Sequence, residues 1–188
     1  VWLPDTTTLA LESPFDFAKQ GELYIPPLTA SPKQPEAHTE AVAEWLPKLI
    51  AADEAVGTLV LFTSRKQMNE VAMRLPEEYL PLLLIQGEIP KSALLEKHAK
   101  ALAEGRASII FGLDSFAEGL DLPGEACVHV IIVKLPFSMP DNPIEKTQNR
   151  WIEQRGGNPF IEITVPEAGI KLIQAVGRLI RTEQDYGR

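Results

Sequence analysis

Four short apolar runs, separated by stretches with helical periodicity, limit what this chain can fold into. The runs contain few polar residues, so we interpret them as strands that are covered on both faces. They occupy residues 58–62, 82–85, 108–111 and 128–133. Buried strands that alternate with helices are typical of βαβ units, which make parallel sheets. The sequence therefore predicts an α/β fold, a three-layer sandwich with a mostly parallel central sheet.

The length and composition suit one domain. The chain has 188 residues, of which 45% are hydrophobic and 23% are charged, which is enough apolar surface for a sizeable core. Prolines and turn-forming residues dominate residues 1–37, which we expect to form an N-terminal arm. Short strands at residues 8–11 and 22–25 would pack this arm on the domain formed by residues 38–188, and a disordered linker is the alternative.

Charge and residue counts exclude several kinds of site. The formal net charge is -8, so a polyanion could be bound only by a local basic patch on an acidic body. A single cysteine, Cys127, cannot form an internal disulfide or hold a metal cluster. The single cysteine also fits a cytoplasmic protein. No apolar run approaches the roughly 20 residues of a membrane span, so no membrane partner is predicted. Because the chain begins with valine, we expect it to be a piece of a longer protein.

The most distinctive segment is residues 174–181, at the end of a helix predicted over residues 166–181. At roughly 100° per residue, Gln174, Arg178 and Arg181 fall on one face of this helix. The opposite face is apolar and is predicted to pack in the core; it carries Leu172, Ile173, Val176, Leu179 and Ile180. Guanidinium groups suit phosphate oxygens, so the polar face is a candidate phosphate site, and a merely solvated face is the alternative.

Two polar segments follow predicted strands and are candidate ligand sites. Thr63, Ser64 and Arg65 offer hydroxyls, a cation and free helix N-terminal amides, which together suit an anion. Ser64 with a glutamine three residues later also forms a capping box, so a purely structural role is the alternative. Gln86 and Gly87 end the next strand, where they could meet a ligand or simply make the turn.

A loop at residues 114–124 gathers three carboxylates, from Asp114, Glu118 and Asp121. The three could ligate a metal ion, bond to ribose hydroxyls or basic partners, or cap the turns of their own loop. Residue types leave these interpretations open. The three histidines are scattered and do not suggest a ligand set, and a glycine-rich phosphate loop ending in Lys and Ser/Thr is absent.

Four segments in this order resemble a known family. They are residues 59–66 (LVLFTSRK), 115–124 (SFAEGLDLPG), 135–137 (LPF) with 141–143 (DNP), and 174–181 (QAVGRLIR). They are similar to motifs IV, V and VI of superfamily 2 helicases, in the XPD-like branch that contains the DinG and YoaA types. The resemblance runs from about Leu9 to Arg188. It implies a RecA-like fold and the second motor domain of an ATPase that moves 5′→3′ along single-stranded DNA.

The resemblance also implies roles for individual residues. Arg178 and Arg181 would reach the γ-phosphate of ATP across a cleft between two motor domains, with Gln174 positioning the phosphates or the attacking water. Further nucleotide contacts fall on Glu118, Gly119, Asp121 and Gly177. Contacts to DNA phosphates fall on Thr63, Ser64, Arg65, Gln86 and Gly87.

The remaining parts of such an enzyme are expected outside this chain. The first motor domain of the same polypeptide would hold most of the ATP and Mg²⁺, and its inserted domain a 4Fe–4S cluster. The family implies a role in DNA repair or replication near the bacterial nucleoid. No metal site is predicted within this chain.

The resemblance also leads to two structural expectations. A strand normally follows the motif VI helix in this fold, but the chain ends at Arg188. We therefore expect a truncated last strand and an exposed sheet edge through which copies could self-associate. We also expect both arginines to be solvent-exposed and unpaired.

Two other functions remain open from the residues. One is a RecA-like module that binds single-stranded DNA or a partner protein without hydrolysing nucleotide. The other is a metal-dependent hydrolase built on the three carboxylates of the acidic loop.

Overall fold

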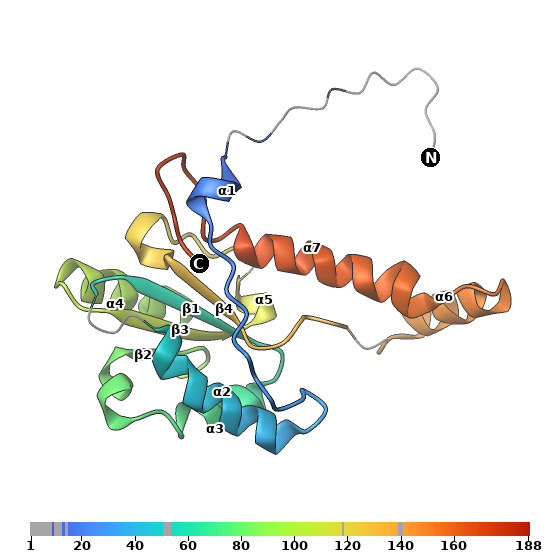
Figure 1. Cartoon of the computed structure of the whole chain (residues 1–188), viewed down its shortest axis with the longest axis horizontal. Coiled ribbons are helices and arrows are strands. Elements are labelled where there is room, and N and C mark those ends of the chain that lie inside the picture. The colour runs from blue at the N-terminus through green and yellow to red at the C-terminus, as the bar shows by residue number, and fades with distance from the viewer. Residues whose placement is uncertain (1–8, 10–12, 14, 51–53, 118, 139–140) are drawn as a thin grey trace.

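The central element is a sheet of four parallel strands in the order β2-β3-β1-β4 (Figure 1). The computed structural model describes residues 9, 13, 15–50, 54–117, 119–138 and 141–188. The strands are β1 (Gly57–Phe62), β2 (Leu83–Ile85), β3 (Ser108–Leu113) and β4 (His129–Ile132). All three strand pairs are parallel, which confirms the α/β prediction.

Helices cover both faces of the sheet. Alternate residues of β1 point to opposite sides: Val60 and Phe62 pack with α2 (Pro35–Leu49) and α3 (Arg65–Ala72), whereas Leu59 and Leu61 pack towards α4, α5 and α7. The other helical segments are α1 (Phe17–Gln20), η1 (Glu77–Leu82), α4 (Lys91–Ala103), α5 (Asp114–Ala117), η2 (Gly124–Cys127), α6 (Pro143–Gln154), a π-helical turn (Phe160–Thr164) and α7 (Val165–Val176). The predicted three-layer sandwich is therefore confirmed. None of the described helices is long and apolar enough to cross a membrane.

Local sequence signals explain where two of these helices begin. The Ser64 hydroxyl caps α3 by accepting a hydrogen bond from the Gln67 amide at 3.4 Å. The Gln67 side chain does not complete the capping box, because it contacts His38 and Thr39 on α2 instead. Asn142 caps α6 and exchanges hydrogen bonds with Glu145.

The N-terminal arm contacts the sheet differently from the prediction. Residues 22–25 form no strand; Leu23 and Ile25 are 86% and 78% exposed. Gly21 instead forms a single parallel bridge with Gly187. The predicted strand at residues 8–11 lies outside the described residues except for Leu9, which belongs to no helix or strand.

The last two residues extend the sheet beyond β4. The Arg188 amide donates to the Val128 carbonyl at 2.9 Å, and the Arg188 carbonyl accepts from the Val130 amide at 2.8 Å. Gly187 faces the other way and pairs with Gln20 and Glu22 of the arm. The C-terminal residues therefore cover the β4 edge near its start. The N-terminal arm in turn covers the outer side of these C-terminal residues. The expected self-association through this edge stays a prediction.

Candidate functional site

The helix that carries the arginine segment ends earlier than its periodicity predicts. α7 ends at Val176, and a tight turn follows in which the Arg178 and Leu179 amides donate to carbonyls three residues back. Gly177 is the C-cap, and glycine is among the weakest helix formers. Arg178 and Arg181 therefore lie beyond the helix, and the prediction that they share a helical face with Gln174 is wrong.

The predicted core face of this helix is also only partly correct. Leu179 and Ile180 are buried, but they lie after the helix and turn back towards the sheet. Ile173 and Val176 are 73% and 44% exposed. The buried side of α7 is formed instead by Ala168 and Ala175.

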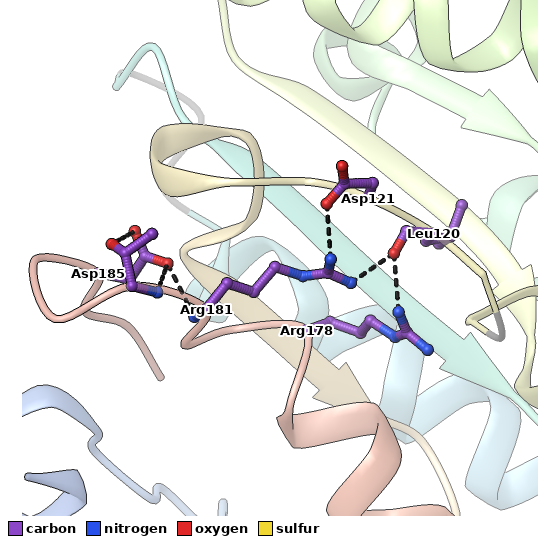
Figure 2. A network of polar contacts seen from close by, with 6 residues as sticks. Leu120, Asp121, Arg178, Arg181 and Asp185 are labelled. Carbon is purple, nitrogen blue, oxygen red and sulfur yellow. Dashed lines mark hydrogen bonds and ion pairs between the residues drawn. The ribbon is translucent and has the colours of Figure 1, made fainter. Parts of the chain in front are cut away.

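Both arginine side chains converge on one backbone carbonyl (Figure 2). Arg178 Nη1 donates to the Leu120 oxygen at 2.8 Å, and Arg181 Nη2 donates to the same oxygen. Arg181 Nη1 also forms an ion pair with Asp121 Oδ1 at 2.6 Å. The Arg181 side chain is 26% exposed, so the expectation of exposed, unpaired arginines is wrong. The sequence could not predict this contact, because a backbone carbonyl carries no residue-specific signal.

A buried carboxylate fixes the backbone next to Arg181. Asp185 Oδ2 accepts from the Arg181 and Thr182 amides, both at 2.8 Å, and Oδ1 accepts from the Thr182 hydroxyl at 2.9 Å. Burial raises the pKa of Asp185, but these hydrogen bonds and one from the Gly124 backbone outweigh it and bring the pKa below its usual value. Sequence reasoning missed Asp185, although a threonine and an aspartate three residues apart are typical of a capped turn.

A hollow of about 230 Å³ lies at the carboxyl ends of the central strands. Its polar lining comes from Asp114, Ser115, Lys171, Gln174 and Arg178. Burial raises the pKa of Asp114, and the positive charge of Lys171 opposes that rise. The structure thus brings Gln174 and Arg178 to one hollow with Lys171, Ser115 and Asp114. The two cations outnumber the single carboxylate, and with the amide and the hydroxyl they suit an anionic ligand.

The acidic loop reaches the site through its backbone more than through its carboxylates. Gly119 has a φ of 68°, a conformation that favours glycine, and Asp121 is 81% exposed at its side chain. Glu118 lies outside the described residues. Within the part of the chain that the structure describes, no three His, Cys, Asp or Glu side chains gather as a metal-binding group.

The two other predicted segments lie together at the end of the sheet. Arg65 Nη1 donates to the Gln86 carbonyl at 3.1 Å, and a Cβ at Gly87 would lie 2.8 Å from the same nitrogen. The Gln86 side chain accepts from the Leu113 amide at 2.7 Å, which ties the ends of β2 and β3. Thr63 and Ser64 precede Arg65 at the end of β1, so all five residues border one corner of the carboxyl edge.

Comparisons with known proteins agree with this architecture. A family model described as a helicase C-terminal domain matches residues 48–188. The chain is 45% identical to the ATP-dependent DNA helicase DinG of Photobacterium profundum, over 99% of this chain and 27% of that protein. It is 37% identical to DinG of Escherichia coli K12, over 95% of this chain and 25% of that protein. The chain thus spans about a quarter of the length of these relatives.

Solved structures show the same fold at low identity. The structure of S. tokodaii Xpd4 matches 100% of this chain over 36% of the Xpd4 chain, with a TM-score of 0.67 and 16% sequence identity. An apo XPD structure matches 85% of this chain and 31% of its own, with a TM-score of 0.59 and 19% identity. These matches confirm the RecA-like fold. The chain belongs to the helicase C-terminal domain family.

Proposed function

We propose that this chain is the second motor domain of an ATP-dependent 5′→3′ DNA helicase of the DinG type. The observation that carries the proposal is the meeting of Arg178 and Arg181 at the Leu120 carbonyl, beside the hollow that Arg178 lines. Two cations at one oxygen repel each other unless an anion lies nearby. Among the described residues, the salt-bridge partner of this pair is Asp121, whose side chain is 81% exposed. A phosphate group would supply the missing negative charge.

Each residue of the site has a part in this function. Arg178 and Arg181 would neutralise the charge that develops on the transferred phosphoryl group. Gln174 would orient the phosphates or the attacking water from the hollow that it lines. Glu118, Gly119, Asp121 and Gly177 would border the nucleotide. ATP and Mg²⁺ would be held mainly by a first motor domain of the same polypeptide, and a 4Fe–4S cluster would also lie outside this chain.

The second surface would hold single-stranded DNA. Thr63, Ser64, Arg65, Gln86 and Gly87 would contact its phosphates, which gives grip without choice of sequence. The hydrogen bond from Arg65 to the Gln86 carbonyl keeps the two segments together as one surface. The enzyme would act in DNA repair or replication, in the cytoplasm near the bacterial nucleoid.

ATP hydrolysis by a two-motor protein tests the proposal. Residues 1–188 can replace the matching quarter of the Photobacterium profundum relative, and hydrolysis is then measured with and without single-stranded DNA. We expect DNA-stimulated turnover, and Arg178→Ala should lower kcat by on the order of 10³-fold because a transition-state charge partner is lost. DNA binding should persist, because none of the five residues proposed to contact DNA lines the hollow that holds Arg178.

Arg106→Ala is the matched control. Arg106 precedes β3 at the opposite end of the sheet and pairs with Glu104 at the surface. Its removal should leave turnover unchanged. Full turnover in Arg178→Ala would refute the arginine assignment. DNA binding without any ATP hydrolysis by the unmodified chimera would favour the non-hydrolysing module instead.

A further inference from the structure

The segment after α7 has to hold Arg181 without the help of a helix. Arg181 lies five residues beyond Val176, where the helix ends, and its side chain has many rotamers to lose. Yet its guanidinium makes two defined contacts, to the Leu120 carbonyl and to Asp121. The guanidinium can make these contacts only if the Arg181 backbone, from which the side chain extends, is held in place.

Asp185 supplies that fixed point. It is 8% exposed and accepts hydrogen bonds from the Arg181 and Thr182 amides and from the Thr182 hydroxyl, besides the one from the Gly124 backbone. Figure 2 shows this carboxylate on one side of the Arg181 backbone, with the guanidinium extending the other way to Leu120. Arg178, by contrast, is held by the turn at the end of α7, where its amide donates to the Ala175 carbonyl, and the Asp185 hydrogen bonds go to residues 181 and 182 instead.

The loop around Asp185 is in turn fastened to the sheet and the arm. Gln20 Nε2 donates to the Asp185 carbonyl at 2.9 Å and to the Thr182 carbonyl at 3.2 Å. Gly187 passes so close to β4 that a Cβ there would lie 2.3 Å from the Val128 carbonyl. The loop therefore has little freedom to shift, and its carboxylate is a rigid support for the arginine.

We propose that Asp185 is a positioning residue that sets where the Arg181 guanidinium lies, and so acts on catalysis only through Arg181. The inference rests on the proposed function. Asp185 lies outside the motif at residues 174–181, and its side chain faces the backbone of residues 181–182 rather than the hollow.

A double-mutant cycle in the two-motor chimera tests this inference. Asp185→Ala should lower kcat on the order of 10²-fold, the effect of misplacing one catalytic group, with KM for ATP unchanged. Asp185→Asn should restore most of kcat, because an amide oxygen can still accept both backbone N–H groups. Arg181→Ala combined with Asp185→Ala should lose no more than Arg181→Ala alone. Additive losses, or an unchanged kcat in Asp185→Ala, would overturn the inference.

If Asp185→Ala folds poorly, a second variant and a hydrogen-exchange measurement test the same role of Asp185. Thr182→Val keeps the side-chain volume and removes only the hydroxyl bond to Asp185, so it should lower kcat by a smaller factor than Asp185→Ala does. Amide hydrogen exchange of residues 181 and 182 should accelerate in Asp185→Ala of the 188-residue chain and not in Asp185→Asn. Unchanged kcat in Thr182→Val together with unchanged exchange would overturn the inference. Full turnover in Arg181→Ala would instead reject the proposed function itself.

Discussion

Gly57 lies in close contact with the segment that precedes β4. A Cβ at this position would lie 2.0 Å from the Ala126 carbonyl oxygen and 2.9 Å from His98 Nε2. We predict that Gly57→Ala lowers the free energy of unfolding by about 3 kcal/mol, because a backbone carbonyl has to move in a packed core. Urea denaturation of the 188-residue chain measures this change.

Gly169→Ala is the matched control for this substitution. Gly169 lies within α7, and a Cβ there meets nothing within 4 Å. The same exchange should therefore raise stability by up to about 1 kcal/mol through helix propensity. Similar losses in both variants would show that close approach at Gly57 is not the cause.

At the scale of elements, α7 and the turn after it divide apolar residues in a way that helical spacing does not predict. Leu179 is 5% exposed beyond the helix, whereas Ile173 is 73% exposed within it. Leu179→Ala should cost about 2–5 kcal/mol of unfolding free energy, since it leaves a cavity. Ile173→Gln should change stability by less than about 0.5 kcal/mol, as an exposed substitution does. Thermal and urea denaturation separate the two, and a loss in Ile173→Gln equal to that in Leu179→Ala would contradict the burial pattern.

The sequence predicts the strands of this fold better than it predicts the arginine site. The four strands are predictable because a run such as residues 58–62 is apolar whatever surrounds it. The arginines are recognisable by type and motif. The Leu120 carbonyl that both arginines contact is not recognisable in the sequence, because every residue has a backbone carbonyl. The prediction that Gln174 and Arg181 share a helical face is wrong because it requires the helix to continue through Gly177, where it ends.

At the scale of the molecule, buried histidines join elements that are far apart in the sequence. His38 links α2 to Gln67 of α3 at 2.9 Å, and His129 lies 3.4 Å from Thr58 between β4 and β1. His98 on α4 contacts the Ser108 hydroxyl and the Ala126 carbonyl, both at 2.8 Å. Because Ala126 offers only an acceptor, His98 Nε2 carries the proton and Nδ1 accepts from Ser108, an arrangement that a neutral ring satisfies completely.

Acid should therefore weaken the whole fold through these rings. Burial is the main cause that lowers the pKa of His38, His98 and His129, with nearby Lys134 adding to the effect at His38 and Arg188 at His129. A histidine whose folded pKa lies below its unfolded value of about 6.5 contributes stability above that pH and loses it as the pH falls.

We accordingly predict that the free energy of unfolding falls between pH 7.5 and 5.5. The His98→Ala variant tests this histidine dependence. It should be less stable than the unmodified chain at pH 7.5, because the Ser108 and Ala126 contacts are lost. Its stability should also fall less steeply with acid, so that the two urea-denaturation curves approach each other towards pH 5.5. An equal slope in both proteins would mean that protonation of His98 does not oppose folding, and that the layers are held against acid by other groups.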